Sequence, residues 1–213
     1  MANPLPFRAA CILGSAVLLG AGTAVAQDQA DDGLPPAGYG RLNQDNISIG
    51  MRTNSLDIRL TILQESALRL LNQDSYTSLN RLVESKRAQI DSVATLFGVP
   101  EPGLLMVRYF ALVEGTRFDA QLLTANVNTL FLDPVAIIPL TTSIQSDRLS
   151  RQQQAVGIYV FADVLTPYFP MAFTYGTTTT NGWDSNRVQV LQRERNRIQS
   201  RVIQEQSDQE GGR

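Results

Sequence analysis

Histidine is absent from the 213-residue chain, and cysteine occurs once, at Cys11. Without histidine, neither a Ser-His-Asp nor a Cys-His catalytic triad can be built, and the most common side-chain ligand of transition metals is missing. A zinc site would have to consist of carboxylates alone, which is an unusual ligand set for zinc. These absences argue against an enzyme, and we expect no cofactor and no metal site.

Charge is also sparse. The chain has 18 Lys and Arg residues against 20 Asp and Glu residues, a formal net charge of −2. No strong field attracts nucleic acid or a membrane surface. No P-loop, dinucleotide-binding fingerprint or calcium loop is present, and no apolar run after residue 26 is long enough to span a bilayer. We expect a protein or a cell-envelope component as partner, and the oligomeric state stays open.

The first 26 residues have the three zones of a secretory signal peptide. Residues 1–8 carry one basic group, residues 9–21 are almost wholly apolar, and Ala24 and Ala26 supply the small-x-small pattern that signal peptidase accepts. We expect cleavage between Ala26 and Gln27, and export to the periplasm or the extracellular space. The alternative is an uncleaved N-terminal anchor, for which the apolar zone is short, since a spanning helix needs about 20 apolar residues.

Cleavage at this point would also remove Cys11, the only cysteine. The mature chain would then have no disulfide and no thiol nucleophile, although disulfides are common in exported proteins. Its stability would depend on a core large enough to stand without covalent cross-links.

The mature chain is long enough for one domain with an appendage. Residues 27–38, rich in Asp, Gln, Gly and Pro, predict a disordered linker, and we expect the domain over residues 39–183. Aliphatic and polar residues alternate over residues 56–62, which is the pattern of a half-buried strand. Further strands are predicted over residues 47–51, 104–113, 122–132, 135–141, 155–162 and 171–175. Together they predict an antiparallel, immunoglobulin-like β-sandwich of about six or seven strands, hence an α+β fold.

Two helical regions are predicted in addition. Apolar residues recur at steps of three and four over residues 66–97, which indicates an inserted amphipathic helical region that ends at Gly98. An interruption near residues 72–75 places a second helix start there, with Asp74 or Ser75 as its cap. Asn181-Gly182 predicts a tight turn. A C-terminal helix over residues 184–206 follows, with Asp184 or Ser185 as its cap, and residues 207–213 form a disordered tail.

Aromatic residues cluster near the end of the predicted sandwich. Tyr168 and Phe169 lie between two prolines, in a stiff loop that predicts an exposed contact point. The other members of the cluster occupy strand positions and predict ordinary core, with a sugar-stacking groove as the alternative: Tyr159, Phe161, Phe173 and Tyr175.

Arginines recur on the predicted C-terminal helix. Arg193, Arg197 and Arg201 are candidates for binding an acidic partner or phosphate. Glu194 and Glu205 dilute this charge, so that a solvated helix face is the simpler interpretation.

The main functional hypothesis is an exported bacterial protein that binds a partner or has a structural role without catalysis. One alternative is a hydrolase that acts on saccharides through carboxylates alone, and its candidates are Glu65, Glu84, Glu101, Glu114 and Asp119. A second alternative is a carrier of an apolar ligand, with a cavity lined by Leu104, Phe110 and Phe161.

Overall fold

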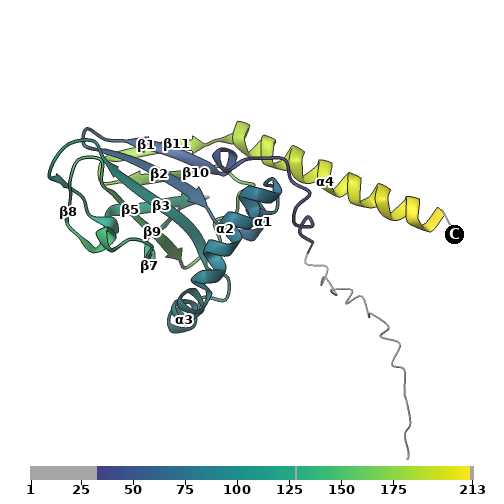
Figure 1. Ribbon diagram of the computed structural model, residues 1–213, viewed down its shortest axis with the longest axis horizontal. Coiled ribbons are helices and arrows are strands. Elements are labelled where there is room, and N and C mark those ends of the chain that lie inside the picture. Colours follow the sequence, from purple (N-terminus) through teal and green to yellow (C-terminus); the bar gives the residue numbers. More distant parts are fainter. Residues whose placement is uncertain (1–32, 128, 212–213) are drawn as a thin grey trace, which may run out of the picture. The chain divides into compact units, whose positions relative to one another are not determined.

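A computed structural model describes residues 33–127 and 129–211 of the chain (Figure 1). The predicted signal peptide, with Ala24, Ala26 and Gln27, lies outside the described residues. The described part is a mixed α+β fold with antiparallel sheets and a C-terminal helix. No helix in this part is both long enough and apolar enough to cross a membrane.

Antiparallel pairing organises the strands into two main sheets and a short ribbon. The first sheet has the order β1 (Ser48–Arg52), β2 (Leu56–Ile62), β3 (Gly103–Ala111), β9 (Gln154–Phe161) and β7 (Pro134–Pro139). The second has the order β11 (Thr178–Trp183), β10 (Met171–Tyr175), β5 (Leu123–Val127) and β6 (Leu130–Leu132). The ribbon pairs β4 (Thr116–Arg117) with β8 (Arg148–Leu149).

Aromatic side chains fill the space between the two sheets. The ring of Tyr109 in β3 lies 5.5 Å from the ring of Tyr175 in β10, measured between centroids. Because side chains alternate along a strand, this contact places the odd-numbered residues of β3 on the inner face of the first sheet. The prediction that the aromatic cluster belongs to the core is confirmed by burial of Tyr159, Phe161, Phe173 and Tyr175.

The two sheets are connected differently at their two lateral margins. At one margin β1 and β11 approach each other, and the hydroxyl of Thr180 donates to the carbonyl oxygen of Gly50 at 3.4 Å. At the other margin β6 leads into β7 through Asp133 alone, so that the chain passes from one sheet to the other. Among the described residues, no strand pairs with the outer edge of β7.

The predicted helical region at residues 66–97 consists of three helices, α1 (Glu65–Leu68), α2 (Gln73–Ser85) and α3 (Arg87–Phe97). The predicted caps of the second helix, Asp74 and Ser75, are wrong. Asn72 is the cap, because its side-chain oxygen accepts the N–H of Ser75 at 2.9 Å. Gly98 ends α3 as predicted. The helices bury apolar residues against the fold, among them Leu79, Val83 and Ile90.

Residues 33–38, part of the predicted linker, pack against the helices. Pro35 is buried, and its carbonyl oxygen accepts a hydrogen bond from Arg69. Gly40 then passes so close to the loop after α1 that an added Cβ would lie 2.2 Å from the carbonyl oxygen of Leu70. Only glycine allows this approach. Two backbone hydrogen bonds continue the contact, Leu42 N to Leu70 O and Asn72 N to Leu42 O, before the short 3-10 helix η1 (Gln44–Ile47).

Helix α4 (Ser185–Gly211) follows β11 directly (Figure 1). Asp184 caps it as predicted, since its carboxylate accepts the N–H of Arg187 at 3.0 Å. The helix is longer than the predicted range 184–206 and includes most of the predicted tail. Val188, Leu191 and Ile198 are its buried apolar positions.

One turn prediction and one strand prediction are wrong. The β10–β11 hairpin turns at Gly176, which has φ of +57°, and Asn181 and Gly182 lie within β11. The predicted single strand at 122–132 is a hairpin of β5 and β6, which turns where Thr129 takes φ of +70°. A β-branched residue rarely adopts this conformation, and the only turn signal in the sequence beside it is Asn128.

Candidate functional site

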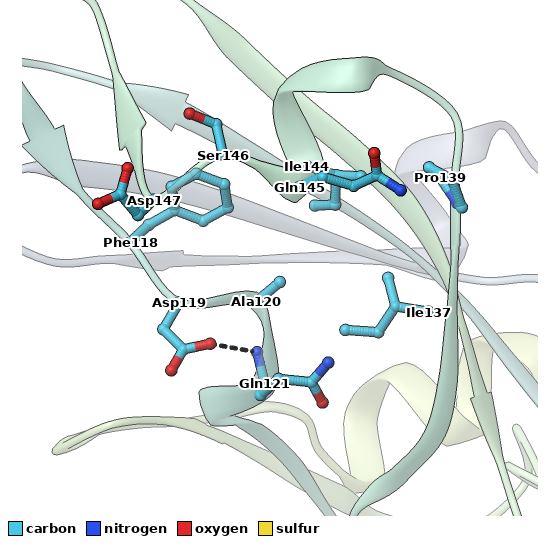
Figure 2. Close-up of a pocket in the computed structure, with 10 residues that line it drawn as sticks. All are labelled: Phe118, Asp119, Ala120, Gln121, Ile137, Pro139, Ile144, Gln145, Ser146 and Asp147. Atoms are coloured by element: carbon cyan, nitrogen blue, oxygen red, sulfur yellow. Dashed lines mark hydrogen bonds between the residues drawn. The ribbon is translucent and has the colours of Figure 1, made fainter.

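A cleft opens beside β7, the edge strand of the first sheet (Figure 2). We call it the edge cleft. It has a volume of about 440 Å³. Three chain segments line it: the start of the β4–β5 connection, strand β7, and the loop that contains η3 (Thr142–Gln145). Its residues are Phe118, Asp119, Ala120, Gln121, Ile137, Pro139, Ile144, Gln145, Ser146 and Asp147.

The apolar part of the edge cleft's lining is exposed because β7 is an edge strand. Ile137 pairs in register with Tyr159 and therefore shares the inner face of the sheet. Within residues 33–127 and 129–211 no further strand covers Ile137, and its side chain is half-buried. Phe118 and Ile144 also line the cleft and are themselves buried.

The polar lining of the edge cleft is acidic. Asp119 and Asp147 are its charged residues, and no Lys or Arg lines it. The Asp119 carboxylate accepts the N–H of Gln121 at 2.9 Å and caps the 3-10 helix η2 (Ala120–Leu122). The Asp147 carboxylate points away from Asp119 and from Ile137 (Figure 2). The cleft therefore presents two negative charges at separate places.

The hydroxyl groups of three buried tyrosines form hydrogen bonds that support the wall of the cleft. Tyr159 donates to the carbonyl oxygen of Ala120 at 2.7 Å. Since Tyr159 has only one hydroxyl proton, Tyr109 is the donor in the 2.7 Å bond between the two hydroxyls. The hydroxyl of Tyr175 accepts the backbone N–H of Asp119 at 3.0 Å. These bonds fix the backbone of two lining residues.

The same tyrosines are poor candidates for acid–base chemistry. Burial raises the pKa of Tyr109 and of Tyr159 far above the ordinary value of a phenol. Burial also raises the pKa of Tyr175. All three hydroxyls are therefore neutral at any physiological pH and act as fixed hydrogen-bonding groups.

The structure separates Tyr168 from Phe169, which were predicted to be exposed together. Phe169 is 51% exposed. Tyr168 is half-buried: its hydroxyl donates to the carbonyl oxygen of Ser66 at 3.0 Å, and the guanidinium of Arg195 lies 5.1 Å from its ring centroid. Tyr168 thus joins α1 to α4, and Arg195 occupies its place on the inner side of α4 by stacking on this ring.

Two of the three candidate arginines of α4 have internal partners. Arg197 binds Glu194 through two nitrogens at 2.9 and 2.7 Å and donates to the carbonyl oxygen of Tyr39. Arg201 pairs with Glu205 at 2.8 Å and lies over the ring of Tyr39. These two residues attach α4 to the segment around Tyr39. Arg193 is exposed and donates to Gln189 on the same helix.

The candidate carboxylates are dispersed over the fold. Glu65 pairs with Arg69, Glu84 pairs with Arg87, and Glu114 accepts the N–H of Arg151. Glu101 is exposed in the loop before β3. Asp119 is the one candidate of the five that lines the edge cleft.

The residues expected to line an apolar cavity do not share a face. Leu104 and Phe110 are even-numbered positions of β3 and face outward, whereas Phe161 pairs with Gly103 and faces inward.

Side chains that could bind a metal ion are dispersed as well. Across residues 33–127 and 129–211, no three Asp or Glu side chains come together where they could bind a metal ion.

The edge cleft depends on residues that the sequence does not single out, above all Ile137, Gln121 and Asp147. The available signal is the run at 134–139, which has proline at both ends and is apolar throughout. Proline is confined to edge strands and strand ends, so this pattern is typical of an edge strand with an uncovered apolar side chain.

Comparison of the chain with protein-family models, with curated proteins and with solved structures gave no match.

Proposed function

We propose that the protein is a non-enzymatic binding protein of the bacterial cell envelope or extracellular space, and that the edge cleft holds its partner. The observation that carries this proposal is an open hollow of about 440 Å³ that combines apolar side chains with two carboxylates and, among the described residues, has no basic residue in its lining. Its volume lies in the range typical of ligand sites, about 300–1,000 Å³.

The charge of the edge cleft selects the chemistry of the occupant. Asp119 and Asp147 attract a cation, and Ile137 and Pro139 offer apolar contact to the carbon chain that carries it. An arginine or lysine side chain combines both properties, because its aliphatic stem packs on apolar surface while its charged end reaches polar groups. The proposed partner is therefore a protein that inserts a basic side chain into the cleft.

Addition of a partner strand along β7 is less favourable. Pro134 and Pro139 stand at the two ends of this strand. Proline has no N–H to donate, which shortens the edge available for pairing. Recognition through an inserted side chain avoids this restriction.

The fixed wall of the cleft supports a role in binding. Hydrogen bonds from Tyr159 to Ala120 and from Asp119 to Tyr175 hold the lining backbone before any partner arrives. A site that is already ordered loses less conformational entropy on association.

Two observations favour binding over carboxylate catalysis. Asp119 is engaged as a helix cap, and the Asp147 carboxylate is directed away from it (Figure 2). Hydrolysis of a glycoside requires two carboxyl groups that flank one bond. The absence of histidine removes the usual general base.

We further propose that the two sheets form an immunoglobulin-like sandwich, supported by the contact of Tyr109 with Tyr175 between inner faces. An experimental structure should have strand directions that differ by about 30° between the sheets, and a near-perpendicular crossing would contradict the proposal.

Export is tested by mass spectrometry of the protein from the periplasmic fraction. The chain should begin at Gln27, and a membrane-bound chain with an intact N-terminus would contradict export.

A titration tests the proposed partner chemistry. Tri-arginine peptide is added to the isotope-labelled mature chain and the backbone amide resonances are followed by NMR. We expect shifts at Gln121, Ile137 and Gln145, weaker at high salt because the attraction is partly Coulombic. Tri-glutamate is the control and should leave these resonances in place. Equal shifts with both peptides, or shifts confined to other surfaces, would contradict the proposal.

A further inference from the structure

We propose that a second pocket, at the end of the sheets, binds a ligand that carries an oxyanion group: a phosphate, sulfate or carboxylate. We call it the end pocket. It has a volume of about 400 Å³ and lies where the β1–β2 turn, strand β4 and the β10–β11 turn meet. Its residues are Arg52, Thr53, Asn54, Ser55, Leu56, Arg117, Tyr175, Gly176, Thr177 and Thr178.

The end pocket is basic in a chain that is acidic overall. Arg52 and Arg117 line it, and no Asp or Glu does. The whole chain, by contrast, has a formal net charge of −2. The end pocket therefore has the opposite charge to the edge cleft and shares no lining residue with it.

The positive charge of the end pocket is not neutralised within the described residues. Neither Arg52 nor Arg117 has a carboxylate within 4.0 Å in the part of the chain that the structure describes. Arg117 pairs in register with Arg148, another arginine. Like charges directly opposite each other in a ribbon are unfavourable, and a bound anion would relieve this repulsion.

The nearest acidic residue in the strand pairing is Asp57, the register partner of Arg52. The two side chains do not come within ion-pair distance. Arg52 thus remains available to an incoming anion.

The turn that frames the end pocket is already ordered. The hydroxyl oxygen of Thr53 accepts the N–H of Leu56 at 3.0 Å, and the carbonyl oxygen of Ser55 accepts the N–H of Leu112 at 2.9 Å. Thr116, which is buried, donates its hydroxyl to the carbonyl oxygen of Val113 at 2.8 Å. These bonds hold Arg117 beside the turn.

Guanidinium groups suit oxyanions because their planar N–H groups can donate two parallel hydrogen bonds to two oxygens. The hydroxyls of Ser55, Thr177 and Thr178 add further donors to the lining. The inference is independent of the function proposed for the edge cleft, since it rests on different residues and on the opposite charge.

Isothermal titration calorimetry of the mature chain with inorganic phosphate, sulfate and citrate tests the inference. Heat with phosphate or sulfate alone assigns the site to tetrahedral oxyanions, and heat with citrate alone assigns it to carboxylates. In Arg117→Gln and Arg52→Gln the dissociation constant should rise about tenfold or more, because each loses a charge-assisted hydrogen bond. Arg81→Gln is the matched control, an exposed arginine on α2 that lines neither pocket, and should bind as the unaltered chain does.

Two results would overturn the inference. One is the absence of binding for all three anions at concentrations up to about 10 mM, which corresponds to a negligible affinity. The other is an unchanged dissociation constant in both pocket variants. Because Arg52 and Arg117 are exposed, the variants should fold, and emission from the buried Trp183 verifies this.

Discussion

The hydroxyl of Tyr159 donates a hydrogen bond of 2.7 Å to the carbonyl oxygen of Ala120, which connects the core to the wall of the edge cleft. Tyr159 is fully buried, whereas Ala120 lines the cleft. A group deep in the core therefore fixes the position of a surface site.

Removal of this hydroxyl should destabilise the protein. In Tyr159→Phe, the Ala120 carbonyl oxygen and the Tyr109 hydroxyl lose their shared partner. We expect the free energy of unfolding to fall by about 1–3 kcal/mol, the usual cost of unsatisfied buried polar groups. Urea denaturation followed by Trp183 fluorescence measures the change. Tyr39→Phe is the control on the surface and should have a smaller effect. An unchanged midpoint in Tyr159→Phe would contradict the role given to this hydroxyl.

Glu194 should make stability depend on pH. Burial alone would raise the pKa of Glu194, but hydrogen bonds from Arg197 and from the N–H of Arg41, together with the charge of Arg197, outweigh it and lower the pKa. A lowered folded-state pKa gives stability that is fully present above the unfolded-state pKa of about 4.3 and is lost as the pH falls through the folded-state value.

The variant Glu194→Gln tests this directly. We expect it to be less stable than the unaltered chain by about 1–3 kcal/mol at pH 7, since hydrogen bonds to a charged group are lost. The difference should shrink as the pH falls below the unfolded-state pKa of about 4.3 and disappear once the pH has passed the lowered folded-state pKa, where the glutamate is neutral as well. Urea denaturation at several pH values measures it. Glu84→Gln is the control, because its ion pair with Arg87 is exposed on both sides. A difference that does not vary with pH would refute the assignment.

Tyr168 and Phe169 should respond differently to truncation although they are adjacent. Tyr168→Ala removes the hydrogen bond to Ser66 and the ring on which Arg195 stacks. We expect a loss of about 2 kcal/mol or more in the free energy of unfolding. Phe169→Ala, at a side chain that is 51% exposed, should be nearly neutral. Equal losses in the two variants, measured by thermal denaturation, would show that Tyr168 does not attach α4.

Local sequence patterns predicted the strands that have one buried face and one more exposed face. Over β2, Leu56, Ile58 and Leu60 are buried and Asp57 and Arg59 are exposed, and the predicted bounds agree with the structure. β10 also has the predicted bounds. In β2 the alternation of aliphatic and polar residues carries the information, and in β10 the apolar run between turn residues does.

Contacts between residues far apart in the sequence determine the features that local patterns could not predict. Glu194 is buried in α4 because Arg41, more than 150 positions earlier in the chain, places its N–H within 2.7 Å. The edge cleft has the same origin: Phe118, Ile137 and Ile144 meet only because β7 becomes the edge of its sheet. No spacing in the sequence encodes that strand order.

The most direct test of the proposed function compares the affinity of tri-arginine peptide for three chains by calorimetry: the unaltered mature chain, Asp147→Asn and Asp57→Asn. Asp147 is exposed at the edge cleft, and Asp57 is an exposed carboxylate on the outer face of β2. We predict that the dissociation constant rises about two- to fivefold in Asp147→Asn, because one of the two negative charges beside the cleft is lost, and stays unchanged in Asp57→Asn. Equal affinity in all three chains would contradict binding at the edge cleft.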